Sequence, residues 1–139
     1  MSANWETVKE GDQLPELRKR PDVPQLVKYA AGSGDFNPLH YDFNFPQAKQ
    51  IGSIIVHGRF KYAALGEVVS NWLGHAGRIQ KLACQYRGMD MPDKPLVCGG
   101  VVKRKWQEGG EKLVEIELWT KNAEGKDTTP GSAIVTLRA

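Results

Sequence analysis

Residues 58–73 read Gly58-Arg-Phe-Lys-Tyr-Ala-Ala-Leu-Gly-Glu-Val-Val-Ser-Asn-Trp-Leu73, and this stretch decides the fold. Apolar side chains recur along it at intervals of three and four residues, from Leu65 through Val68 to Trp72. This spacing gathers them on one face of an α-helix. The stretch therefore predicts a long helix from Gly58 to about Leu73 with a broad apolar face to bury, and Gly74 is expected to end it.

After this helix the hydrophobic pattern changes to the period of a strand. The alternating apolar positions are Leu82, Cys84 and Tyr86, then Val114, Ile116 and Leu118, and finally Ala133, Val135 and Leu137. Alternation of this kind predicts half-buried strands, and a further strand is expected over residues 96–106. Turn-forming residues at 91–95, 108–110 and 122–125 separate the runs. We therefore expect a meander of four antiparallel strands.

One long apolar helix followed by such a meander predicts an α+β fold, in which a curved antiparallel β-sheet wraps a long central helix. With 139 residues the chain has the length of one domain, and we expect residues 1–139 to form a single domain. A sheet covered by one helix leaves edges and apolar surface to protect. Pairing with a second copy or a related chain is therefore expected.

The region before the long helix predicts a shorter helix and a loop. Asp22 is suited to cap the start of this helix, and Pro24 to occupy its first turn. Gly32 and Gly34 are expected to stop it, so that residues 35–40 leave its end as a loop. A short strand is expected earlier, near residues 13–17.

The composition is that of an ordinary globular protein, with 40% hydrophobic and 25% charged residues and a formal net charge of +3. The positive residues are scattered, which argues against nucleic acid as a partner. The first residues lack the basic end and apolar run of a signal peptide, and no apolar segment approaches membrane-spanning length. We expect a cytoplasmic protein with no membrane partner, in which Cys84 and Cys98 are reduced structural thiols.

The segment Ser33-Gly-Asp-Phe-Asn-Pro-Leu-His40 concentrates special residue types in eight positions. It sets Asp35 and His40 five residues apart on a stretch that glycine and proline keep from being helical. A carboxylate and a neutral imidazole can share one water molecule there, which is the minimum needed to add water to an activated double bond or remove it. The alternative is structural: Asp35 caps a turn, and Asn37-Pro38 is a common turn dipeptide.

A second motif, Val56-His57-Gly58, stands at the start of the long helix. The first N–H groups of a helix lack internal partners, and the helix N-terminus carries partial positive charge. A glycine lets a ligand carbonyl approach the backbone, so this N–H can stabilise the enolate oxygen that develops on a thioester. The alternative is that the motif only begins the helix.

Metal and cofactor sites are less well supported. Asp35, Asn37, His40 and Asp42 offer oxygen and imidazole ligands, but the three histidines form no His-x-x-x-His pair and no cysteine cluster is present. The sequence contains no P-loop, dinucleotide fingerprint or Gly-x-Ser-x-Gly elbow. We expect no metal and no cofactor.

The segment from Tyr29 to His40, together with Ala48 and the run Ile55–Gly58, resembles the MaoC-like, (R)-specific enoyl-CoA hydratase family. The resemblance extends from Val8 to the final strand. It implies a hot-dog fold, and an enzyme that reversibly adds water, in syn fashion, to a 2-enoyl thioester of coenzyme A or acyl carrier protein to give a (3R)-hydroxyacyl thioester. Family members dimerise side by side or carry two such units in one chain, which implies a homodimer or a heterodimer with another hot-dog subunit.

The resemblance also implies roles for individual residues. Asp35 and His40 would hold one water; Asp35 would act as base, while His40 would orient the water and help to deliver a proton to the α-carbon. The backbone N–H of Gly58 would bind the thioester oxygen. Substrate-binding positions would fall to Asn37, which would also brace the loop, and to His57 and Arg59.

Some positions depart from the family pattern. Arg59 and Lys61 occupy the first turn of the helix, where a methionine or similar residue is usual, Gly66 stands in place of a common serine, and Ile54 in place of a common proline. A cation at a helix N-terminus opposes the helix dipole. Arg59 therefore requires a partner, which could be an acid at a subunit interface, Glu67 or a substrate carboxylate. The remaining alternative is an Arg59 that is merely solvated.

Other functions are compatible with the same fold. The chain could be a non-catalytic subunit of a heteromeric dehydratase, but it keeps both Asp35 and His40, which favours a catalytic role, alone or as the catalytic half of a heterodimer. A hot-dog thioesterase would place an acid on the central helix, where Glu67 is the candidate. A pure ligand-binding module would leave the Asp35–His40 pair idle.

Overall fold

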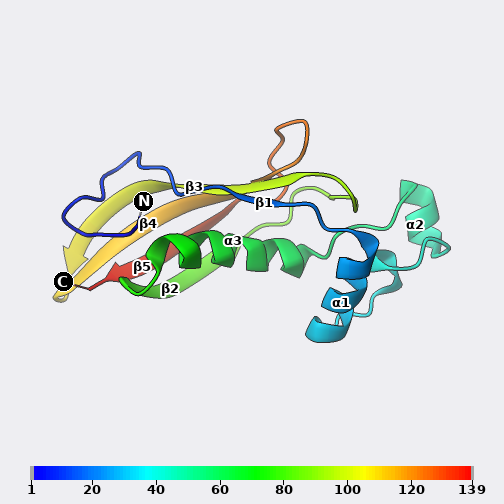
Figure 1. The fold of residues 1–139 in the computed structure, drawn as a ribbon, viewed down its shortest axis with the longest axis horizontal. Coiled ribbons are helices and arrows are strands. Elements are labelled where there is room, and N and C mark those ends of the chain that lie inside the picture. Colours follow the sequence, from blue (N-terminus) through cyan, green and yellow to red (C-terminus); the bar gives the residue numbers. More distant parts are fainter. Residues whose placement is uncertain (1, 139) are drawn as a thin grey trace.

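In a computed structural model that describes residues 2–138, one long helix lies along a five-stranded antiparallel sheet (Figure 1). The helices are α1 (Val23–Ser33), the 3-10 turn η1 (Pro38–His40), α2 (Pro46–Ile51) and α3 (Gly58–Leu73). The strands are β1 (Leu17–Lys19), β2 (Gly77–Cys84), β3 (Leu96–Glu108), β4 (Glu111–Lys121) and β5 (Gly131–Leu137). The predicted α+β class is confirmed, and the curled sheet around a central helix is the hot-dog fold. The described residues contain no helix long and apolar enough to cross a membrane.

Helix α3 has the predicted bounds, Gly58–Leu73, and ends at Gly74. Its predicted apolar face is buried against the sheet: Leu65, Val68 and Trp72 are each at most 1% exposed. Burial of a side chain of this size stabilises the fold by roughly 1.5–3 kcal/mol. Figure 1 shows that α1 and α2 lie beyond the end of the sheet at which α3 begins. The fold therefore brings the N-terminus of α3 close to the loops around these short helices.

The order of the strands differs from the predicted four-strand meander. Strands β3, β4 and β5 do form a meander, but β2 pairs with β5 at the far edge, and the sheet order is β1-β3-β4-β5-β2. The predicted meander was wrong in its first pairing, because residues 85–95 form a connection much longer than a hairpin turn and β2 does not pair with β3. This places β2 at an edge of the sheet, beside α3.

The first strand is also shorter than expected and lies further along the chain. The strand β1 covers Leu17–Lys19, whereas the predicted range 13–17 contributes only an isolated bridge between Gln13 and Val101. Pro15 lacks an N–H and therefore interrupts the ladder of hydrogen bonds at this point. Similarly, β2 ends at Cys84, and Tyr86 lies beyond it with an exposed ring.

Helix α1 begins as predicted, with the Asp22 carboxylate accepting a hydrogen bond of 2.9 Å from the Gln25 N–H. The end of the helix corrects one expectation, since Gly32 lies within α1 and Gly34 alone caps it, in the left-handed conformation with φ 76°. Residues 35–40 leave this cap. A small second core, which includes Leu26 and Phe60, packs α1 against the start of α3.

Both cysteines are free thiols, as expected. Cys98 is buried in β3, and this burial raises its pKa to about 12. A thiol with so high a pKa stays protonated and unreactive at cellular pH. Cys98 therefore acts as a small core residue.

Candidate active site

The loop after α1 sets Asp35 and His40 side by side. The side-chain oxygen of Asn37 accepts the Leu39 N–H at 3.1 Å and so starts the turn η1, which carries His40. The Asp35 carboxylate is held in turn, because its Oδ1 accepts the Asn37 N–H at 3.3 Å. These two local bonds leave Asp35 Oδ2 facing His40.

The gap between these two side chains is sized for one water molecule. The Nε2 of His40 lies 3.8 Å from Asp35 Oδ2, which is too long for a direct hydrogen bond but allows one water to bond to both atoms. The other ring nitrogen, Nδ1, lies 2.8 Å from the Ile55 carbonyl oxygen. Because a carbonyl only accepts, Nδ1 carries the hydrogen, and Nε2 of the neutral ring offers its lone pair toward Asp35.

His57 lies behind this pair, with no exposed surface. Its ring stacks on the His40 ring at a centroid distance of 3.9 Å, and its Nε2 lies 3.3 Å from the carbonyl oxygen of Asp35. Burial lowers the pKa of His57, and the positive charge of protonated His40 would lower it further. The structure therefore places His57 as a neutral support for the loop, in contact with Asp35, His40 and the Tyr29 ring.

Gly58 follows His57 directly and begins α3. Its N–H has no acceptor among residues 2–138. A Cβ at this position would lie 3.0 Å from the Tyr86 ring, so the packing of Tyr86 also favours a glycine. Gly58 lines a cavity of about 350 Å³. A free donor at the positive end of a helix is suited to bind an oxygen that gains negative charge.

The partner of Lys61 could not be identified from the sequence. Lys61 is only 2% exposed, and its ammonium group donates to Asp90 Oδ2 at 2.9 Å and to the Gly88 carbonyl at 2.8 Å. The Asp90 carbonyl in turn accepts the Val56 N–H at 2.7 Å. The connection between β2 and β3 is thus fastened to the start of α3, beside Gly58.

The other two charged positions on α3 have different surroundings. Glu67 pairs with Lys19 at 2.9 Å, and it therefore does not serve as the partner of Arg59. Arg59 is exposed and forms no ion pair with residues 2–138. It lines a second cavity, of about 600 Å³, together with Tyr29 and Tyr86.

The geometry of Asp35, His40 and His57 suits proton transfer better than metal binding. The three side chains do offer potential ligand atoms within 4.8 Å of one another. However, the two imidazole rings are stacked, with an interplanar angle of 22°. A metal ion binds in the plane of each imidazole, and two nearly parallel planes do not meet at a nearby point. A tetrahedral site is therefore not formed by these residues as they stand.

The buried pair should contribute measurably to stability. Replacement of Lys61 by methionine leaves the Asp90 carboxylate buried without a counter-charge, and we expect a loss of about 3–5 kcal/mol in the free energy of unfolding. Chemical denaturation of Lys61→Met, Asp90→Asn and the double variant measures the coupling, and the double variant should recover part of the loss. The control is Lys19→Met, which breaks the more exposed pair with Glu67 and should cost less than about 1 kcal/mol. Equal losses at Lys61 and Lys19 would contradict this assignment.

The buried His57 should make stability depend on pH. Because its pKa is lowered in the folded protein, the unfolded chain binds a proton at this residue more readily. Its contribution to stability is therefore complete above the ordinary value of 6.5 and is lost as the pH falls from 6.5 through the lowered pKa. Urea denaturation across this range should show a shallower decline for His57→Gln than for the exposed-site control His75→Gln. Identical slopes in the two variants would rule out the assignment.

Comparison with known proteins identifies the family and relates it to fatty acid synthases. Residues 6–123 match the family described as "MaoC like domain". The chain is 28% identical over 107 residues to the fatty acid synthase subunit beta of Saccharomyces cerevisiae (strain ATCC 204508 / S288c). That match covers 76% of this chain and 5% of the yeast protein, so the chain corresponds to a small part of that relative.

Solved structures show the same fold. The R-hydratase PhaJ1 from Pseudomonas aeruginosa superposes with a TM-score of 0.85 at 21% identity, covering 96% of this chain and 84% of that chain. A chain of the ChsH1-ChsH2 complex from Mycobacterium tuberculosis superposes with a TM-score of 0.80 at 23% identity, covering 95% and 99%. With the family match over most of its length, the chain belongs to the MaoC-like domain family of hydratases and dehydratases.

Proposed function

We propose that the protein is a hydratase and dehydratase of acyl thioesters, which reversibly adds water to a 2-enoyl-CoA or 2-enoyl-ACP to give a (3R)-hydroxyacyl thioester. The observation that carries this proposal is the gap of 3.8 Å between Asp35 Oδ2 and His40 Nε2, together with the free N–H of Gly58, which directly follows the His57 that stacks on His40. One end of this arrangement can handle a water molecule, and the other can hold a thioester oxygen.

The water reacts from its position between the two side chains. Asp35 Oδ2 and His40 Nε2 each accept a hydrogen bond from the water, which leaves an oxygen lone pair free to attack the β-carbon. Asp35 acts as base toward the water, and His40 orients it and helps to pass the proton to the α-carbon. The oxygen of the water bonds to the β-carbon and one proton reaches the α-carbon, so the pair ends in its starting protonation state. Because the water oxygen and the proton reach the double bond from the same side, the addition is syn.

The backbone stabilises the charge that this attack creates. As the β-carbon is attacked, electrons move toward the thioester oxygen, which becomes an enolate. The Gly58 N–H donates to this oxygen, and the N-terminus of α3 adds its partial positive charge. Loss of one such donor typically costs about 10²–10³-fold in kcat. The same groups serve the reverse reaction, in which the α-proton is removed and water leaves.

The thioesterase alternative has weaker support. Its candidate acid, Glu67, lies further along α3 than Gly58 and forms an ion pair with Lys19 of β1. A carboxylate that already neutralises a lysine is a poorer base for water. The proposed hydratase also accounts for the neutral His57 behind the loop, which the thioesterase chemistry does not use.

We further propose that the working form is a dimer with a second copy or with another hot-dog chain. Strand β2 forms one edge of the sheet, so its outer backbone groups can pair with another strand. Several large apolar side chains near the site loops are exposed, among them Phe36, Phe43 and Met89. A solved structure with the same fold is a complex of two different chains. These features support an assembly of two hot-dog units.

The catalytic pair is tested by an assay of the hydration of 2-enoyl-CoA thioesters of several chain lengths. The reaction is measured as the loss of the absorbance of the enoyl group. Asp35→Asn and His40→Ala should each lower kcat by about 100-fold or more, because each removes a group that handles the proton. The control is Asp42→Asn, whose carboxylate only accepts the Asn44 N–H in the next turn, and its activity should stay near that of the wild type. Thioester hydrolysis that survives both changes would point instead to Glu67.

The dimer is tested by size exclusion with light scattering, on the protein alone and on the protein co-expressed with the product of a neighbouring gene. A homodimer should have twice the mass of the 15.5 kDa chain and should hydrate enoyl-CoA by itself. A heterodimer should show activity only after co-expression. A monomer that is fully active alone would contradict the proposed assembly.

A further inference from the structure

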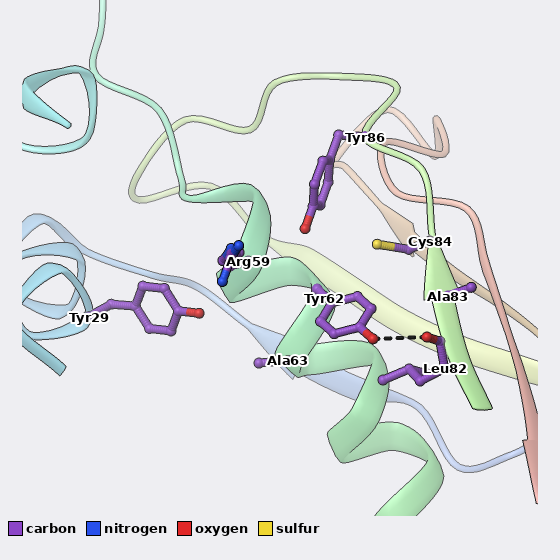
Figure 2. Close-up of a pocket in the computed structure, with 8 residues that line it drawn as sticks. All are labelled: Tyr29, Arg59, Tyr62, Ala63, Leu82, Ala83, Cys84 and Tyr86. Atoms are coloured by element: carbon purple, nitrogen blue, oxygen red, sulfur yellow. Dashed lines mark hydrogen bonds between the residues drawn. The ribbon is translucent and has the colours of Figure 1, made fainter. Parts of the chain in front are cut away.

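The larger cavity, of about 600 Å³, lies between the first turns of α3 and the end of β2 (Figure 2). Part of its wall is apolar, formed by Ala63 on α3 and by Leu82 and Ala83 on β2. The rest is polar, with Arg59 from the first turn of α3 and the rings of Tyr29 and Tyr86. A ligand that suits this cavity therefore has an apolar part and a polar part.

The polar groups of the cavity point toward one another. Figure 2 shows the hydroxyls of Tyr29 and Tyr86 directed into the space on either side of Arg59. Burial raises the pKa of both hydroxyls, so that they remain protonated donors, and the positive charge of Arg59 opposes this shift in each case. The Tyr62 hydroxyl is not available, because it donates to the Leu82 carbonyl at 2.8 Å. The groups that face the cavity are thus one cation and two tyrosine hydroxyls, of which that of Tyr86 also meets the Cys84 thiol. A guanidinium with two hydroxyl groups beside it matches an anionic oxygen group.

This cavity adjoins both halves of the proposed active site. Tyr29 meets the His57 ring edge-on at a centroid distance of 4.9 Å, and the negative charge of Asp35 contributes to its raised pKa. On the other side, the Tyr86 ring packs against Gly58. A thioester whose oxygen is bound at the Gly58 N–H can therefore extend its acyl chain into this space.

A ligand with an anionic group would supply the counter-charge that Arg59 lacks in the part of the chain that the structure describes. A cation in the first turn of a helix opposes the helix dipole, and no acid within residues 2–138 forms an ion pair with Arg59. Its neighbour Lys61, in the same turn, is compensated by Asp90. The anion that Arg59 lacks within the described chain can be supplied by the substrate.

We propose that this cavity binds a carboxylate carried by the acyl chain, through Arg59, Tyr29 and Tyr86, so that the preferred substrates are 2-enoyl thioesters with a second acid group. The proposal rests on the hydratase function proposed above. It adds the substrate class, since the apolar wall receives the chain and the polar groups receive its anionic end.

The test compares pairs of 2-enoyl-CoA thioesters of equal length, one ending in a carboxylate and the other in a methyl group. The wild type should favour the carboxylate member in kcat/KM. Arg59→Gln should reduce this preference about tenfold or more, chiefly through KM, and Tyr29→Phe and Tyr86→Phe should reduce it less. The matched control is Arg18→Gln, which removes the same charge from a side chain that is 75% exposed and does not line the cavity. It should retain the wild-type preference.

A second arm identifies the anion. The same acyl groups are presented as N-acetylcysteamine thioesters, which lack the phosphates of coenzyme A. The preference and its loss in Arg59→Gln should persist with these substrates. If Arg59→Gln instead lowers kcat/KM equally for both coenzyme A thioesters, and the effect disappears without the phosphates, Arg59 binds the carrier and the proposal is overturned. A wild type that hydrates neutral substrates with no preference for the acid also refutes it, whereas a wild type that hydrates no enoyl thioester refutes the proposed function itself.

Discussion

The packing of α3 along the curled sheet is the constraint on which the rest of the structure depends. Its apolar face, which includes Leu65 and Trp72, is buried over the whole length of the helix, so the helix can neither rotate nor slide without exposing core residues. This fixes the position of its N-terminus, and with it the Gly58 N–H. His57, one residue before Gly58, stacks on His40 and contacts the Asp35 carbonyl. These contacts fix the loop that holds Asp35 and His40 relative to the start of α3. The side-chain half and the backbone half of the site are thus aligned by a single helix.

The two cations in the first turn of α3 show how the fold manages charge next to this site. Lys61 faces inward and is paired with Asp90, from the connection between β2 and β3. The same connection is too long for a hairpin turn, so β2 does not pair with β3 and lies instead at the far edge of the sheet, beside β5. The unexpected strand order and the buried ion pair are therefore linked: the segment that separates β2 from β3 is the segment that supplies the counter-charge. Arg59 faces outward, and no such segment reaches it.

The sequence predicted what depends on local patterns and failed where distant segments meet. Periodicity and glycine placement were enough for the bounds of α3 and for the loop that carries Asp35 and His40. The partner of β2 depends on a pairing between segments far apart in the chain, which alternation alone cannot specify. Lys61 did give a signal, because it lies on the same helical face as Leu65 and Val68, and a charge within an apolar stripe indicates a buried counter-ion. Its partner stands 29 residues away, beyond the reach of any local pattern.

In the proposed site, the residues that would carry out the reaction are held by backbone contacts, whereas the residue that would select the substrate, Arg59, is exposed. The reacting pair is held by backbone atoms: the Ile55 carbonyl orients His40, and the Asn37 N–H orients Asp35. Such contacts persist when neighbouring side chains change, so the same reaction can be kept while the substrate varies. Arg59 is exposed and does not pack in the core. Its replacement is therefore expected to change the free energy of unfolding very little. Selection on the acyl chain can act at this position almost independently of stability, whereas at Lys61, two residues further on, it cannot.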